Sequence, residues 1–306
     1  MKKVPLLSKV IRDRWSLIML LPTMLLLFLF CYLPIYGVLI SFQNYRIGGD
    51  ILSLRGKTEW VGLFHFTRFL KSIFFTRVFG NTIRLSVETL LFGFWVPVVF
   101  ALLLNEVRHM GFRRVAQTCV YLPYFISTVI VVAMLISMTG AGGAVNKLLS
   151  VFGVEPVEMI NSARHFDILY VASNIWQTFG YSSIIYIAAM SSIDPTLYEA
   201  ATVDGANRLH RVVHITLPGI GPTVAILLIL SAGGIMGSNT EKVLLMINPM
   251  TTDRADVIGT YVYNIGLRNA QYSYSAAVGL FANVINFVLV FGTNWASRRF
   301  TSYSLW

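Results

Sequence analysis

The feature that most constrains this chain is a series of apolar runs of transmembrane length, separated by polar stretches. A helix needs roughly 20 apolar residues to cross a hydrocarbon layer ~30 Å thick, because each residue adds ~1.5 Å. Six runs approach or exceed that length, at 15–42, 81–105, 116–138, 166–193, 220–236 and 274–296. One soluble core could not bury six such runs. We therefore predict an all-α, polytopic membrane protein with six transmembrane helices.

The composition supports a membrane protein. Of the 306 residues, 56% are hydrophobic and only 12% are charged, whereas soluble domains typically have about 25% charged residues. The net charge of +10 is explained by Lys and Arg beside the spans, which set orientation and contact anionic lipid, so no nucleic acid is expected. The basic tail 1–14 predicts a cytoplasmic N-terminus, and six spans then place the tail 298–306 on the same side.

No motif for catalysis or energy conversion is present. The sequence lacks the phosphate loop G-x-x-x-x-G-K-[ST], the zinc motif H-E-x-x-H and the nucleophile motif G-x-S-x-G. His210 and His214 are one helical turn apart, but no third ligand at suitable spacing completes a metal site. We expect no catalytic residue, no metal site and no cofactor bound by this chain.

Polar residues inside the predicted spans mark a candidate substrate pathway, because polar groups in hydrocarbon face protein or a watery cavity. The candidates are Asn174, Trp176, Gln177, Tyr181 and Tyr186 in the fourth run and Glu88 in the second. Aromatic rings stack on the C–H faces of sugars and amides pair with hydroxyls. This cluster therefore suits a carbohydrate and suits a strongly charged solute poorly. Ordinary hydrogen bonding between helices is the alternative for each residue.

The long polar interruption 194–218 is the second candidate site, since about 2–6 residues would suffice to join two helices. Asp194-Pro195 is typical of a helix start. We predict a short helix from Tyr198 to Gly205, followed by a return to the membrane that is broken at Pro218. Glu199 is available for a charged contact, and the small residues after it allow another surface to approach the backbone closely.

This interruption resembles the "EAA" loop of permease subunits of binding-protein-dependent ABC importers. The match is Glu199-Ala200-Ala201-x3-Gly205-x9-Ile215-x-Leu217-Pro218. Further segments are similar to the oligosaccharide and polysaccharide permeases whose binding protein is a lipoprotein. They include Tyr32-Leu33-Pro34-Ile35-Tyr36-Gly37, Tyr121-Leu122-Pro123-Tyr124-Phe125-Ile126-Ser127 and Tyr303-Ser304-Leu305-Trp306.

The resemblance implies a type I ABC importer permease fold, both termini in the cytoplasm, and a coupling helix seated in a groove of an ATPase. The residues that it assigns to this contact are Glu199, Ala200, Ala201, Asp204, Gly205, Ala206, Leu217 and Pro218. The implied partners are a second homologous permease, two cytoplasmic ATPases that use ATP and Mg, and an extracytoplasmic binding protein that delivers an oligosaccharide.

Two other functions remain open. The loop motif alone also fits an importer of amino acids, peptides or polyamines. An ion-coupled carrier or membrane-embedded enzyme should show charged residues at the midplane and repeated spans. Glu88 is the only acidic residue well inside a predicted span, and no repeat is visible.

The glycine-rich stretch 233–239 departs from the family pattern and predicts a looser or differently shaped cavity.

Overall fold

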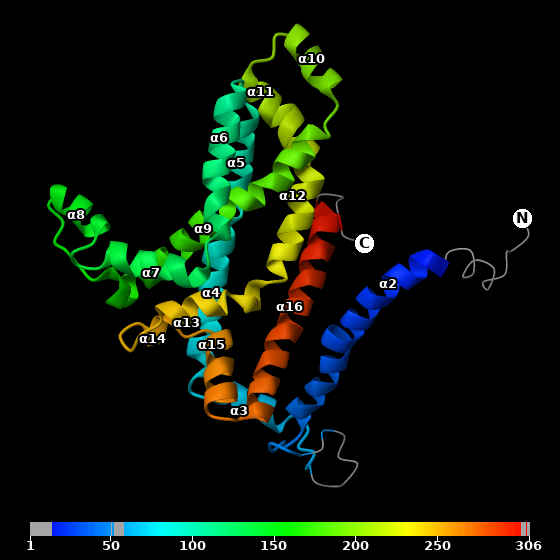
Figure 1. Ribbon diagram of the computed structural model, residues 1–306, viewed down its shortest axis with the longest axis vertical. Helices are drawn as coiled ribbons and strands as arrows, with labels where there is room; N and C mark the ends of the chain where they lie inside the picture. The colour runs from blue at the N-terminus through cyan, green and yellow to red at the C-terminus, as the bar shows by residue number, and fades with distance from the viewer. Residues whose placement is uncertain (1–13, 50, 52–57, 301–303, 305–306) are drawn as a thin grey trace, which may run out of the picture. The chain divides into compact units, whose positions relative to one another are not determined.

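The computed structural model describes residues 14–49, 51, 58–300 and 304. Within these residues the regular structure is helical, apart from an isolated β-bridge between Gln43 and Trp60. The chain divides into two compact units, Met1–Leu70 with Ile265–Leu280 and Lys71–Asn264 with Phe281–Trp306. An all-α membrane protein is what the sequence predicts, and the helices confirm the fold class (Figure 1).

The first unit begins with a long helical stretch that changes its winding. It consists of α2 (Arg14–Leu27), a π-turn η1 (Phe28–Tyr32) and the 3-10 segment η2 (Leu33–Phe42). A proline at the start of η2 lacks the N–H of a regular helix, which explains the altered turns before it. The short helix α3 (Phe64–Leu70) buries His65, whose Nε2 lies 3.1 Å from the carbonyl of Gln43. Burial lowers the pKa of this imidazole.

The second unit contains most of the other helices. They are α4 (Phe75–Gly93), α5 (Trp95–Asn105), α6 (Met110–Tyr121), η3 (Leu122–Phe125), α7 (Thr128–Thr139), α8 (Ala144–Val151), η4 (Met159–Asn161), α9 (Ala163–Ser191), α10 (Pro195–Val203), α11 (Arg208–Arg211), η5 (Val212–Thr216), α12 (Leu217–Ala232), η6 (Ile235–Gly237), α13 (Thr240–Met246), α14 (Thr252–Ala255) and α15 (Ile258–Tyr263). Two further elements, η7 (Asn264–Arg268) and α16 (Tyr272–Phe300), contribute residues to both units.

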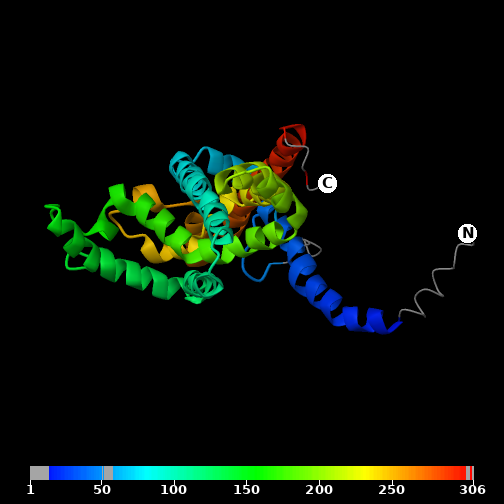
Figure 2. The ribbon, with the colours of Figure 1, turned by 90° about the horizontal axis from the view of Figure 1, so that it is seen from above.

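The helix α9 is the centre of the second unit. It packs against α4, α5, α6 and α12, and Figure 2 shows it beneath α10 and α11. Its contact with α6 depends on Gly180, because a Cβ at this position would lie 2.1 Å from the carbonyl oxygen of Val120. One apolar cluster at the α5 side contains Tyr186, and another contains Tyr170. Both tyrosines also line a cavity beside α9.

Five helices in the described part of the chain are long and apolar enough to cross a membrane. They are Arg14–Phe42, Phe75–Asn105, Thr128–Val151, Arg208–Ala232 and Tyr272–Arg299. The helix α9, which covers most of the predicted fourth run, is long enough but is not one of them, because Asn174, Gln177 and several hydroxyls lower its hydropathy. The count of six spans therefore stays a prediction.

The helix ends differ from the predicted runs in two places. The third run is interrupted by η3 and the extended residues that follow it, because Pro123 ends the regular hydrogen bonding of α6. The predicted break at Pro218 is wrong, since the helix is continuous from Arg208 to Ala232. The π-turn η5 ends two residues before Pro218, so the winding changes close to the position where the proline lacks the N–H of a regular helix.

Candidate functional site

The loop 194–218 folds into a helical hairpin whose first helix is α10. Asp194 caps this helix, because its Oδ1 accepts a hydrogen bond from the backbone N–H of Thr196 at 2.9 Å. That bond holds the pKa of the Asp194 carboxyl below its ordinary value. The turn after α10 passes through Gly205 at φ 77°, a conformation that glycine adopts without strain. The predicted helix start at Asp194-Pro195 is confirmed.

The hairpin is bound to the rest of the unit from its inner side. The hydroxyl of Tyr198 lies 3.0 Å from Oγ1 of Thr216, which is completely buried. A guanidinium N–H of Arg211 donates to Oγ1 of Thr202 at 3.1 Å. Because Tyr198 and Thr202 belong to α10 and the other two residues lead into α12, a displacement of α10 would be transmitted to α12.

The outer side of the hairpin is apolar and open. Val203 is 89% exposed and Leu209 is 71% exposed. The side chain of Glu199 is exposed and has no partner among the described residues. Such a surface, with apolar residues around an unpaired charge, is suited to contact with another protein.

Only half of the predicted contact residues line a hollow of about 460 Å³ on the hairpin. Ala201, Asp204, Gly205 and Ala206 line it, whereas Glu199, Ala200, Leu217 and Pro218 are exposed elsewhere on the hairpin and at the start of α12. His210 and His214 also line the hollow, with ring centroids 4.2 Å apart. Among the described residues no group of three side chains could hold a metal ion.

A larger cavity of about 560 Å³ lies within the second unit, between α4, α5, α9 and α12. Three of the six predicted pathway residues line it, namely Asn174, Tyr181 and Tyr186. The other three do not. Gln177 is buried and donates a hydrogen bond to the carbonyl of Ile126 at 3.0 Å, so its amide contributes to helix packing. Trp176 is 42% exposed, and Glu88 is partly buried outside the cavity wall.

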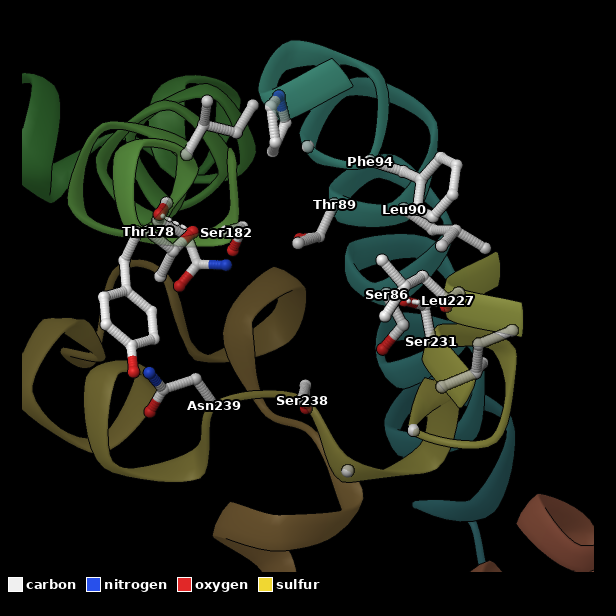
Figure 3. Close-up of a pocket in the computed structure, with 18 of the residues that line it drawn as sticks. Ser86, Thr89, Leu90, Phe94, Thr178, Ser182, Leu227, Ser231, Ser238 and Asn239 are labelled. Atoms are coloured by element: carbon white, nitrogen blue, oxygen red, sulfur yellow. Dashed lines mark hydrogen bonds between the residues drawn. The ribbon is translucent and has the colours of Figure 1, made fainter. Parts of the chain in front are cut away.

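Sequence reasoning missed the hydroxyls of the cavity. Ser86, Thr89 and Ser238 each have a buried hydroxyl oxygen without a hydrogen-bond partner in the described part of the protein. In Figure 3, Ser86 and Thr89 on α4 face Thr178 and Ser182 on α9 across the cavity. The only sequence signal for Ser86 and Thr89 was their position inside an apolar run, which serine and threonine share with many ordinary packing positions; Ser238 lies in the glycine-rich stretch 233–239.

An aromatic pair forms another part of the cavity wall. The rings of Tyr124 and Tyr181 are stacked, with centroids 3.9 Å apart and planes inclined by 5°. Tyr124 belongs to η3, so the interruption of the third run is what presents this ring to α9. Sequence reasoning identified Tyr181 but not its partner, because the two residues are distant in the chain.

The glycine-rich stretch 233–239 also lines the cavity, through Gly234, Ile235 and Gly237 and the two residues that follow. Its course is held by two hydrogen bonds. The backbone N–H of Met236 donates to Oδ1 of Asn286 at 2.8 Å, and that of Asn239 donates to the hydroxyl of Tyr170 at 3.1 Å. The stretch that departs from the family pattern is therefore part of the cavity wall.

Next to the cavity, Asp167 binds two arginines. Its Oδ2 accepts two hydrogen bonds from the guanidinium of Arg254, at 2.6 and 2.9 Å, and its Oδ1 accepts one from Arg84 at 3.3 Å. These pairs join α9, α14 and α4. The Asp167 carboxylate thus lies between two positive charges and fastens α14 to the long helices α4 and α9.

We expect Asp167→Asn to lower the thermal stability of the detergent-purified protein, because two neighbouring guanidinium groups then lose their counter-charge. Hydrogen bonds to charged groups contribute about 1.5–3 kcal/mol, and partial exposure of the arginines reduces that value. Asp253→Asn is the matched control, since Asp253 is 91% exposed in its side chain and should change stability little. Equal midpoints for both variants would show that the cluster does not stabilise the fold.

Lys242 on α13 is a buried charge outside the candidate spans. It is 0% exposed, and its Nζ has no hydrogen-bond partner in the described part of the chain. Burial lowers the pKa of this amine from 10.5 to about 8. The unfolded chain therefore binds more protons than the folded one between about pH 8 and 10.5, so stability should rise with pH in that window.

The expected result is that Lys242→Met raises the melting temperature at pH 7 and removes the rise in stability between pH 8 and 10. The gain is on the order of 3 kcal/mol at most, since one pKa unit corresponds to ~1.4 kcal/mol. Melting curves at several pH values measure it, with the exposed Lys147→Met as the control. A lower melting temperature for Lys242→Met alone would mean that the amine has a stabilising partner.

Comparisons with known proteins agree with this architecture. The model of the family described as binding-protein-dependent transport system inner membrane component matches residues 90–302. The polygalacturonan/rhamnogalacturonan transport system permease protein YteP of Bacillus subtilis (strain 168) is 40% identical over 300 residues, which cover 98% of this chain and 92% of that protein.

Two solved structures are similar over nearly the whole chain. One is a bacterial alginate ABC transporter in complex with an alginate pentasaccharide-bound periplasmic protein, with 39% identity, a TM-score of 0.88 and coverage of 98% of this chain and 99% of that one. The other is a bacterial ABC transporter involved in the import of the acidic polysaccharide alginate, with 40% identity, a TM-score of 0.87 and coverage of 97% and 99%. This chain therefore belongs to the family of binding-protein-dependent transport system inner membrane components.

Proposed function

We propose that this chain is a transmembrane permease subunit of an ABC importer that translocates an oligosaccharide or polysaccharide fragment across the cytoplasmic membrane. The observation that carries the proposal is the cavity wall, where the amide of Asn174 and the hydroxyls of Thr178 and Ser182 line the same cavity as the stacked rings of Tyr124 and Tyr181. A polyhydroxylated solute satisfies those hydroxyls and stacks on aromatic rings. The relatives named for polygalacturonan and alginate transport support the same class of solute.

The partners follow from the same assignment. A second homologous permease would complete the pathway, two cytoplasmic ATPases would bind and hydrolyse ATP with Mg, and an extracytoplasmic lipoprotein would deliver the sugar. A similar structure contains a sugar-loaded periplasmic protein, which supports the last of these. In this scheme the chain binds no cofactor and has no catalytic residue.

The hairpin of α10 and α11 is the proposed contact with the ATPases, and both termini lie on its side of the membrane. When the ATPases close, they move α10 through Glu199 and the exposed apolar residues around it. The Tyr198–Thr216 hydrogen bond passes this movement to η5 and α12. Because Leu227 and Ser231 of α12 line the cavity, the same movement reshapes the pathway.

Deletion of the gene followed by complementation tests this function. We expect growth on single oligosaccharides to be lost and to be restored by the wild-type gene. The double variant Asn174→Leu, Tyr181→Leu should not restore growth, because it removes an amide and a ring from the cavity wall. Ala172→Leu is the control, since it adds the same side chain at an exposed position of α9.

The competing function is import of an amino acid, peptide or polyamine. A binding screen with the cognate binding protein separates the two, because it identifies the delivered solute directly. Binding of a saccharide supports the proposal. Selective binding of an amino acid, peptide or polyamine, with uptake of that solute by the wild-type strain, would replace it.

A further inference from the structure

Five residues of α9 line the cavity at every fourth position. They are Tyr170, Asn174, Thr178, Ser182 and Tyr186, and each of them has a hydroxyl or amide group. Four residues advance a helix by ~6 Å, so this α9 series extends over ~24 Å. Its positions form a slowly winding stripe, because residues four apart lie close to the same face. Polar groups therefore recur at regular intervals along the length of the cavity.

The opposite wall repeats the same chemistry. Ser86 and Thr89 of α4, Ser231 of α12, and Ser238 with Asn239 contribute hydroxyl and amide groups (Figure 3). Each hydroxyl can donate or accept a hydrogen bond, which matches the hydroxyls of a sugar. Two walls with hydroxyls along their length can contact both edges of an extended sugar chain.

Among the residues that the structure describes, those of the cavity wall include no charged side chain. None of its residues is Lys, Arg, His, Asp or Glu. The nearby guanidinium groups of Arg84 and Arg254 interact with two carboxylates, Asp167 and Glu88, so the cluster has equal numbers of positive and negative groups and offers no net counter-charge. Transfer of a carboxylate into such a site costs far more than transfer of a hydroxyl, because the ion loses its hydration without gaining an opposite charge.

From these three observations we propose that this chain's side of the pathway takes an uncharged, linear saccharide lying lengthwise along α9, and that it discriminates against sugars carrying carboxylates. The inference rests on the proposed function and narrows its solute class. It also distinguishes this chain from the similar transporter that imports the acidic polysaccharide alginate.

Matched sugar pairs test the inference in the complete importer, reconstituted in liposomes with its partner permease, ATPases and binding protein. Each pair is an oligouronide and its carboxyl-reduced counterpart, with the same length and linkage. Several linkages are screened for loading of the binding protein, and uptake is divided by the measured loading. We expect the neutral member to be imported at least about tenfold faster per loaded binding protein, which corresponds to ~1.4 kcal/mol.

A charge placed in the wall should change this preference. Ser182→Lys is expected to shift the ratio of the two uptake rates toward the carboxylated sugar by about tenfold, since it supplies the missing counter-charge. Ser182→Gln is the control of similar length without charge and should leave the ratio unchanged. Melting curves of both variants confirm that the importer remains assembled.

The outcomes separate the inference from the function on which it rests. Equal or faster import of the carboxylated member by the wild-type importer, or loading and import of carboxylated sugars alone, would overturn the inference and retain saccharide import. Failure of every saccharide to load or to be imported would overturn the proposed function itself.

Discussion

Gly205→Asp and Glu199→Lys are each expected to reduce solute uptake at least tenfold while the chain still inserts into the membrane. Neither change should disturb the fold. A Cβ at Gly205 would meet nothing within 4 Å, and the cost of an aspartate at its positive φ is only about 1–2 kcal/mol. The side chain of Glu199 is exposed and has no partner among the described residues. What both changes alter is the surface that we propose as the ATPase contact, where one central contact would be worth about 2 kcal/mol or more.

Uptake of the radiolabelled solute and ATPase co-purification measure this effect. Glu155→Lys is the matched control, because it reverses the same charge at an exposed position between α8 and α9. It should transport normally. Unchanged uptake in both hairpin variants would show that α10 does not couple the ATPases to transport.

Gly180→Leu is expected to prevent assembly of a stable protein. Even a Cβ at this position would lie 2.1 Å from the carbonyl oxygen of Val120, and 2.6 Å from its carbonyl carbon. These are backbone atoms, so no rotamer change relieves the clash and α6 and α9 have to separate. Overpacking in a core typically costs about 1–3 kcal/mol, and a whole leucine against a backbone should exceed that range.

The yield and melting temperature of the detergent-purified protein measure this change. Gly80→Ala on α4 is the control, because a Cβ there meets nothing within 4 Å and alanine favours a helix by ~0.5–1 kcal/mol. The control should be as stable as the wild type or more so. A Gly180→Leu variant with wild-type stability would mean that α6 and α9 do not approach as closely as described.

Local patterns predicted the hairpin well. Asp194-Pro195 predicts the start of α10 without knowledge of the tertiary structure, because a carboxylate cap and a proline at the first position act within a few residues. The break expected at Pro218 failed for a related reason, since a proline predicts a lost hydrogen bond but not how the chain adapts to the loss. Here the winding changes at the π-turn η5, and the helix continues.

Local patterns did not predict which residues line the cavity. Among the polar residues of α9, Asn174 faces the cavity and Gln177 binds the carbonyl of Ile126. Both are amides in an apolar run, and only the position of the neighbouring helices separates a cavity-lining residue from a packing residue. The same holds for Tyr124, whose ring stacks on that of Tyr181 in a different helical element.

The sequence by itself determined that this chain is a helical membrane protein, and it located the α10 hairpin, because hydropathy and capping act over one or two helical turns. The tertiary structure decided which side chains share the cavity. It brought the hydroxyls of α4 opposite the α9 series and added the stretch 233–239 to the wall. Helix packing depends on long-range contacts such as Gly180 on Val120, which no local pattern encodes.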